Sequence, residues 1–181
     1  MIGVPAPISP QGLPTSPSRV PNLDIAAVQQ WARAAQVNLV FENDIKLATL
    51  AEQHWGAARG SSHFALLEER EDGVGLGVMI GNQLYEGEHG RAGELAMVRV
   101  PHAKRLVSIE DVPRPKRLEV MAQLVAGFAA LLDFGLLLVQ SDRDSSALLE
   151  RIRFFAGDVL VVKPSALGTD GPLRGAVLLE Y

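Results

Sequence analysis

Apolar residues recur along the chain either at helical spacing or in short continuous runs. Spacings of three and four residues predict helices over about 25–35, 45–56, 117–134 and 145–156. Short apolar runs predict strands over about 37–41, 63–67, 74–80, 136–139 and 159–163, and a last helix is expected from Gly171 to Tyr181. Helices and strands therefore alternate, which is typical of an α/β fold.

The predicted strands at 63–67 and 74–80 are expected to form a hairpin. The acidic run between them, Glu68 to Asp72, is interpreted as a solvated turn. Glycines at alternate positions, Gly73, Gly75 and Gly77, either let a phosphate approach the backbone amides or mark a tightly packed sheet. The segment 99–116 has three prolines and mixed charge and is expected to be a connector.

Composition narrows the class of protein. The 181 residues carry a formal charge of −4, so no overall basic field is present to attract nucleic acid. The absence of cysteine excludes disulfides and thiolate metal sites. The longest apolar runs, at 134–139 and 159–162, are far shorter than the roughly 20 residues of a membrane span. The first 21 residues contain six prolines and do not resemble a signal peptide, so a cytoplasmic location is expected.

The pair Asn43-Asp44 lies at the junction of a predicted strand and a predicted helix. A carboxylate at such a junction faces the crevice in which open α/β folds bind ligands, and the helix dipole favours its ionised form. Asp44 is therefore a candidate general base for a hydroxyl group. The alternative is that Asp44 simply caps the helix, as Asp24 is expected to cap the helix that begins near residue 25.

Several motifs, taken in order, resemble the ROK family of repressors, open reading frames and sugar kinases. They are Phe41–Glu52, Trp55–Gly60, Gly73–Gly77, Leu84–Gly87 and Gly90–Leu95, with Gly3–Pro7 and Leu167–Ala176 near the two ends. The resemblance covers nearly the whole chain, and an ordered set is more specific than any single motif.

The resemblance implies an actin-like ATPase (ribonuclease H-like) fold of two lobes with a sugar held between them. Residues 1–44 would form an incomplete N-terminal lobe and residues 45–181 the C-terminal lobe, with the last helix packing back on the first lobe. In the family's kinases the aspartate matching Asp44 is the general base, and residues matching Asn43 and Glu94 bind sugar hydroxyls. Gly73 and Gly75 would contact a nucleotide, if one binds.

The chain departs from the kinase pattern on the nucleotide side. The family's first phosphate loop, Asp-x-Gly-Gly-Thr, would precede Met1, so we expect a truncated relative. The second phosphate loop, Gly-Thr-Gly in kinases, corresponds here to Glu71-Asp72-Gly73. Like charges 4 Å apart repel by about 4 kcal/mol at an effective dielectric constant near 20, so these carboxylates would oppose ATP. The adenosine-packing Gly-Gly is replaced around Gln140-Ser141-Asp142.

The family's zinc motif is also missing. Its Gly-Glu-Ile-Gly-His segment is Gly93-Glu94-Leu95-Ala96-Met97 here, without the histidine, and the cysteine-rich loop that follows is missing. No metal is therefore expected. The four histidines, His54, His63, His89 and His102, are interpreted as surface residues. Trp31 and Trp55 either form a stacking platform for a sugar or pack in the core, and the core is favoured because both lie on apolar helix faces.

The combined prediction is the effector-binding and dimerisation domain of a ROK-type transcriptional regulator without kinase activity. It would bind a sugar or sugar phosphate through Asn43, Asp44 and Glu94, need no cofactor, form a homodimer, and contact DNA only through a winged helix-turn-helix outside this sequence. The apolar face of the 117–134 helix suits both the core and a dimer interface. Two alternatives remain open: a kinase using ATP and Mg²⁺ with Asp44 as base, and an inert dimerisation module.

Overall fold

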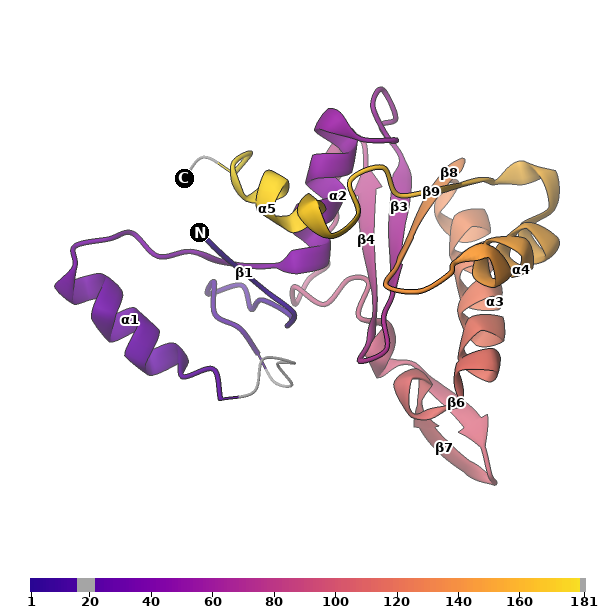
Figure 1. Ribbon diagram of the computed structural model, residues 1–181, viewed down its shortest axis with the longest axis horizontal. Coiled ribbons are helices and arrows are strands. Elements are labelled where there is room, and N and C mark those ends of the chain that lie inside the picture. Colours follow the sequence, from indigo (N-terminus) through magenta and orange to yellow (C-terminus); the bar gives the residue numbers. More distant parts are fainter. Residues whose placement is uncertain (16–21, 180–181) are drawn as a thin grey trace.

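A central sheet organises the protein, as the computed structural model shows over residues 1–15 and 22–179 (Figure 1). The sheet has five strands in the order β5-β4-β3-β8-β9. Their bounds are β3 Phe64–Glu69, β4 Val74–Ile80, β5 Gln83–Leu84, β8 Leu136–Ser141 and β9 Val161–Pro164. Strands β3 and β4 are antiparallel and form the expected hairpin, whereas β3, β8 and β9 run parallel.

Helices cover both faces of this sheet. Alternate residues of β3 and β8 point to opposite faces, so Leu67 and Val139 join one apolar cluster while Leu66 and Leu138 join another. The first cluster packs beneath α3 (Arg114–Leu132) and α4 (Ser146–Ala156), and the second beneath α2 (Asp44–Trp55). The helix α5 (Gly171–Ala176) packs on α2 and also contacts β1.

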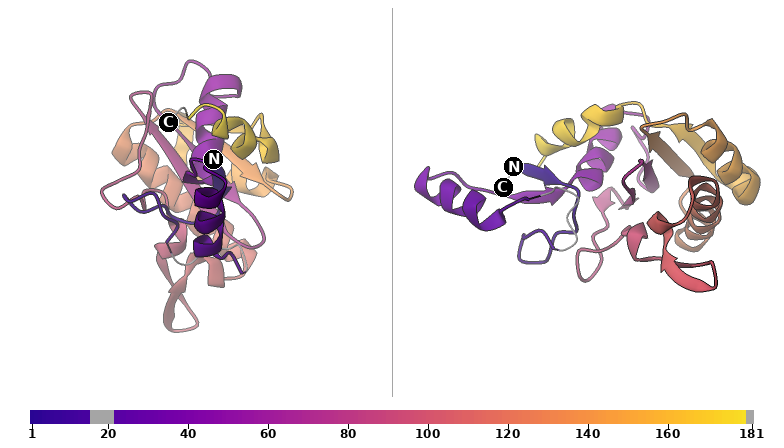
Figure 2. Two further views of the ribbon diagram at one scale, coloured as in Figure 1. Left: turned by 90° about the vertical axis from the view of Figure 1, so that its left-hand side faces the viewer. Right: turned by 60° about the horizontal axis from the view of Figure 1, so that its bottom comes forward.

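A smaller unit lies beside α2, at the end of the molecule away from α3 and α4 (Figure 2). It consists of the parallel strands β1 (Ile2–Val4) and β2 (Phe41–Asn43) with the helix α1 (Ile25–Ala34). Asp24 caps α1 as expected, because its carboxylate accepts a hydrogen bond from the Ala27 amide. The expectation of a strand at 37–41 was wrong in position, since pairing with β1 begins only at Phe41.

Other local expectations were also wrong. The tryptophans are not in the core: Trp31 is 61% and Trp55 40% exposed, because α1 buries Ala32 rather than Trp31 and Trp55 ends α2. The segment expected to be a connector contains a hairpin, β6 (Arg99–His102) with β7 (Arg105–Ser108), and α3 already begins at Arg114. The last helix ends at Ala176, and Tyr181 lies outside the described residues.

The acidic run also differs from the expected solvated turn. Glu68 and Glu69 belong to β3, and both are buried, Glu69 completely. The strand continues through them because Glu69 still pairs with Val74 of β4 and with Ser141 of β8. Only the residues after Arg70 form the turn.

Candidate functional site

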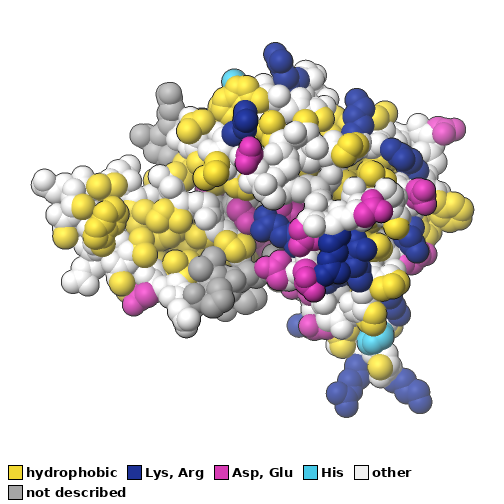
Figure 3. Space-filling model, viewed as in Figure 1, with side chains coloured by type: hydrophobic (Ala, Val, Ile, Leu, Met, Phe, Trp, Pro, Cys, Tyr) yellow, Lys and Arg dark blue, Asp and Glu magenta, His cyan; other side chains and the backbone are white. Residues whose placement is uncertain are grey.

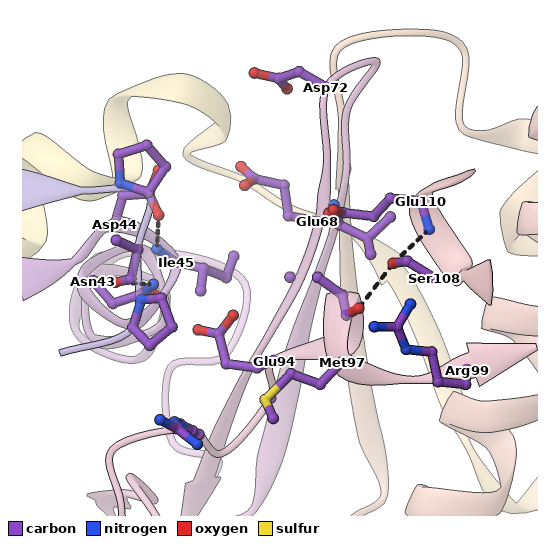
Figure 4. A pocket seen from close by; sticks show the side chains of 18 residues that line it. Asn43, Asp44, Ile45, Glu68, Asp72, Glu94, Met97, Arg99, Ser108 and Glu110 are labelled. Atoms are coloured by element: carbon purple, nitrogen blue, oxygen red, sulfur yellow. Dashed lines mark hydrogen bonds between the residues drawn. The ribbon is translucent and has the colours of Figure 1, made fainter. Parts of the chain in front are cut away.

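A cavity of about 700 Å³ lies where the small unit meets the central sheet. Four parts of the chain line it: the segment after β1, the start of α2, the β3–β4 hairpin, and the region from residue 91 to 110. The lining residues are Pro5, Ala6, Pro7, Asn43, Asp44, Ile45, Glu68, Asp72, Val74, Gly75, Arg91, Gly93, Glu94, Ala96, Met97, Arg99, Ser108 and Glu110. All three residues expected to bind a ligand, Asn43, Asp44 and Glu94, are among them (Figure 4).

The junction of β2 and α2 places the first two. Asn43, not Asp44, caps the helix: its Oδ1 accepts from the Lys46 amide and its Nδ2 donates to the Ala6 carbonyl. These two hydrogen bonds fix the orientation of the buried Asn43 side chain at the edge of the cavity. The cap leaves Asp44 as the first helical residue, where the helix dipole favours a negative charge. The interpretation of Asp44 as the cap was thus wrong by one residue.

A glycine-rich loop positions Glu94. Gly93 has φ +82°, and a Cβ there would collide with the carbonyl oxygen of Leu76 in β4. The Leu76 amide donates to the Gly93 carbonyl over 3.1 Å, which fixes the loop on the sheet. Figure 4 shows the Glu94 carboxylate directed toward the start of α2, on the opposite side of the cavity.

Arg70 is a charged neighbour of Asp44 that sequence analysis missed. Its Nη2 lies 2.7 Å from Glu68 Oε1 and 3.8 Å from Asp44 Oδ2. Glu68 also accepts from the Gln140 side chain, 2.8 Å away. Burial acts to lower the pKa of Arg70, but Glu68, Asp44 and Asp72 outweigh burial and raise it. The only available signal was the run Glu68 to Asp72, which hid Arg70 because the whole run was interpreted as a turn.

Beside this site, a second charged network ties the end of β3 to α3 and β8. The fully buried Glu69 receives two hydrogen bonds from Arg114, one from Arg117 and one from the Ser141 hydroxyl. Burial acts to raise the pKa of Glu69, but these donors and the two positive charges lower it overall. Figure 3 shows acidic and basic side chains gathered together over this end of the sheet.

The residues expected on a nucleotide side are two carboxylates, Glu71 and Asp72, and two glycines, Gly73 and Gly75. Asp72 lines the cavity, and Glu71 forms an ion pair with Arg143 at 2.6 Å. Gly75 lies in β4 and lines the cavity, whereas Gly73 is buried just before that strand. Met97, which occupies the position of the histidine in the family's motif, lines the cavity and is 58% exposed.

Within residues 1–15 and 22–179, no group of three or more His, Cys, Asp or Glu side chains is arranged to hold a metal ion. In the same ranges, no helix has the length and apolar character needed to cross a membrane.

Comparisons with known proteins define the class. The fold is the α/β fold of the actin-like ATPase class, and the model of the ROK family matches residues 1–106. The chain belongs to the ROK family. None of the curated proteins is similar enough in sequence to match.

Solved structures of family members resemble most of the chain. The ROK hexokinase from Thermus thermophilus is 21% identical with a TM-score of 0.69, covering 97% of this chain and 76% of its own. A ROK family glucokinase from Streptomyces griseus, in complex with glucose and AMPPNP, is 18% identical with a TM-score of 0.72, covering 97% and 78%. A ROK family transcriptional regulator, a homologue of the E. coli MLC protein, is 15% identical with a TM-score of 0.64, covering 83% and 53%.

Proposed function

We propose that the cavity beside Asp44 binds a sugar and that the protein is the sugar-sensing part of a ROK-type transcriptional regulator, not a phosphotransferase. Sugar binding is supported by the position of Asn43, Asp44 and Glu94 around one cavity. Carboxylates and amides suit neighbouring hydroxyl groups because they accept and donate several hydrogen bonds at fixed angles. The glucokinase relative was solved with glucose.

The observation that carries the proposal is the charge of the β3–β4 end of the cavity. Glu68 and Asp72 line it, and the neighbouring Glu71 is also acidic. The arginines nearest this end, 70, 114, 117 and 143, are engaged with the carboxylates of Glu68, Glu69 and Glu71. Arg91 and Arg99 also line the cavity, on its side formed by residues 91 to 110. Phosphoryl transfer depends on positive groups that neutralise the phosphates. A neutral sugar meets no such conflict here.

Phosphoryl transfer to a sugar is the second candidate. It is favoured by the placement of Asp44 at a helix start inside the cavity, where a general base for a sugar hydroxyl would lie, and by the number of kinases among similar structures. ATP and Mg²⁺ would then be required. An inert dimerisation module is the third possibility.

Calorimetric titration with glucose, N-acetylglucosamine and xylose separates the three. For the sugar-sensing function we expect binding of one of them, loss of that binding in Asp44→Ala, and unchanged binding in Asp24→Ala. The control removes an aspartate at the start of α1, outside the residues that line the cavity. An assay coupled to ADP release should show no sugar-dependent turnover. Turnover that disappears in Asp44→Asn would establish the kinase instead, and the absence of heat with every sugar would favour the inert module.

A further inference from the structure

The first turn of α2 separates two cavities. Asp44 and Ile45 face the large one. Lys46 and Glu42 face a smaller one of about 270 Å³, which lies on the other side of the turn. The loop from Glu86 to Glu94 borders both, since Glu86, Glu88 and Gly90 line the small cavity whereas Arg91 and Glu94 line the large one.

Lys46 connects the helix to this loop. Its side chain is only 3% exposed, and its Nζ donates to the Gly90 carbonyl over 3.3 Å. Taking an ammonium group out of water costs free energy unless the charge is compensated. The buried Glu42 supplies compensation: burial raises the pKa of Glu42, while the charge of Lys46 acts to lower it. A lysine kept in such a place holds the loop with a charge-assisted hydrogen bond.

The loop is also fixed on its other sides. Gly90 has φ +70°, and a Cβ there would collide with the carbonyl oxygen of Ile8. Three residues later, Gly93 lies against Leu76 of β4. The short stretch between these two contacts carries Arg91, and Glu94 follows directly. The Lys46 hydrogen bond therefore acts at the point where the loop passes from the small cavity to the large one.

We propose that Lys46 is a positioning residue for the sugar site, which holds Gly90 so that Arg91 and Glu94 face Asp44 across the large cavity. Its backbone amide is bound by the Asn43 cap and its side chain by Gly90, so one residue links the start of α2 to the loop. The part of this proposal that concerns sugar binding rests on the proposed function. The effect on the loop does not depend on any ligand.

Amide hydrogen exchange of the protein without ligand tests whether Lys46 holds the loop. The amides of Ala92, Glu94 and Leu95 donate within the loop, to the carbonyls of Glu86, Arg91 and Gly93. In Lys46→Met, which keeps the unbranched apolar stem and removes the ammonium donor, we expect exchange in peptides covering 86–95 to accelerate about tenfold, in line with the loss of one charge-assisted hydrogen bond. Lys116→Met is the matched control, because Lys116 Nζ also donates to a backbone carbonyl, that of the exposed Pro101. It should leave the loop unchanged.

Sugar affinity tests whether the loop position that Lys46 holds matters to the sugar site. With whichever of glucose, N-acetylglucosamine and xylose binds the native protein, Lys46→Met should weaken binding about tenfold and Lys116→Met should not. Lys46→Gln, a neutral donor, should recover part of both properties, which a merely structural role would not give. If Lys46→Met does not fold, Lys46→Gln alone tests the proposal. We then expect a smaller acceleration of amide exchange that is confined to residues 86–95.

The results that would overturn the proposal are distinct from those that overturn the proposed function. Unchanged exchange at 86–95 in the folded variants, or equal acceleration in β3, β4 and β8, would show that Lys46 does not position the loop. Accelerated loop exchange with native sugar affinity would show that the loop position does not matter to the site. If no sugar binds the native protein, the proposed function fails, and the exchange experiment still decides whether Lys46 holds the loop.

Discussion

Arg70 and Asp44 face each other from two different parts of the fold, the end of β3 and the start of α2, with 3.8 Å between Nη2 and Oδ2. The Asp44 carboxylate is held from its other side as well, because Oδ1 accepts from the Ile45 amide at 2.9 Å. A ligand that binds Asp44 therefore meets a carboxylate whose orientation is already restricted.

We expect Arg70→Met to weaken sugar binding about three- to fivefold. The pair is partly exposed, with about a third of the Arg70 side chain accessible, so its contribution is that of a screened ion pair, about 0.5 to 1 kcal/mol. Arg143→Met is the control, since it removes the ion pair with Glu71, which does not line the cavity. Calorimetry on both variants measures the difference, and equal affinities would exclude a role for Arg70 in the site.

The buried carboxylate of Glu69 should be important for stability. Glu69→Gln leaves Arg117, itself buried, without its charged partner. Breaking a buried ion pair on one side costs about 3 kcal/mol or more. We expect a correspondingly lower free energy of unfolding in urea at pH 7. Glu71→Gln, which affects only the surface pair with Arg143, should change it by less than about 1 kcal/mol.

Glu69 and Glu42 should give stability opposite dependences on pH. The pKa of Glu69 is lowered in the folded protein, so its contribution is present above the pKa of an unfolded glutamate, near 4.5, and is lost as the pH falls through the folded value. The pKa of Glu42 is raised, chiefly by burial, so its contribution is fully present below 4.5 and is lost as the pH rises through the folded value.

Urea unfolding of two variants between pH 3 and pH 7 checks these signs. Glu69→Gln should flatten the loss of stability toward acid, whereas Glu42→Gln should remove a loss that occurs as the pH rises above 4.5. If both variants keep the pH profile of the native protein, neither carboxylate has the shifted pKa that its surroundings indicate.

Self-association should involve the exposed ends of α3 and α4. Most apolar residues of α3, such as Leu118, Met121 and Val125, are buried in the core. The apolar face of α3 therefore packs within its own chain and leaves only exposed residues near the end of the helix for a dimer interface. Leu131 and Phe154 are nevertheless 82% and 81% exposed. We expect the protein to be a dimer by light scattering and the double variant Leu131→Lys, Phe154→Lys to be a monomer of unchanged stability. A dimer that survives both changes would place the interface elsewhere.

The sequence predicted the three central strands of the sheet, β3, β4 and β8, because each contains a continuous apolar run that is largely buried on both faces. The strand Val74–Ile80 was predicted with its observed bounds. The strand Leu136–Ser141 was predicted from its first residue to Val139, and only its two polar residues at the end, Gln140 and Ser141, were not included. The sequence-based prediction was wrong where contacts with residues distant in the sequence determine whether a strand continues. Glu69 continues the strand because Arg114 and Arg117 neutralise its charge, and Glu68 accepts a hydrogen bond from the neutral Gln140 side chain; these three partners lie 45 or more positions away in the sequence.

Local patterns were also misleading where a helix buries little. In α1 only Ala32 is buried, so the spacing that placed Trp31 on an apolar face described a helix with little to pack against. Asn43, Asp44 and Glu94 line one cavity because backbone features visible as motifs position them, a strand–helix junction and a glycine-rich loop. Their role in binding a sugar stays a prediction. Arg70 was missed because the acidic run that contains it was interpreted as a turn, although Glu68 in that run is its partner. Lys46 was missed because the carbonyl that it binds, that of Gly90, lies 44 positions away in the sequence.

Gly93 offers a direct test of how the loop carries Glu94 into the cavity. Both Gly93 and Gly60 have positive φ, +82° and +81°, but a Cβ at Gly60 meets no atom within 4 Å, whereas one at Gly93 would collide with the Leu76 carbonyl oxygen. Alanine at Gly60 should therefore cost only the left-handed conformation, about 1 kcal/mol. At Gly93 the displaced backbone adds to this cost, giving about 3 kcal/mol in total.

In thermal unfolding we expect Gly93→Ala to melt about 8 °C below the native protein and Gly60→Ala only about 3 °C below it, given the usual relation between stability and melting temperature for a chain of this size. Sugar binding should also weaken in Gly93→Ala, measured well below its melting temperature, because Glu94 moves with the loop. Equal melting temperatures for the two variants would mean that the loop can leave β4 without cost, and native affinity in Gly93→Ala would mean that Glu94 does not contact the sugar.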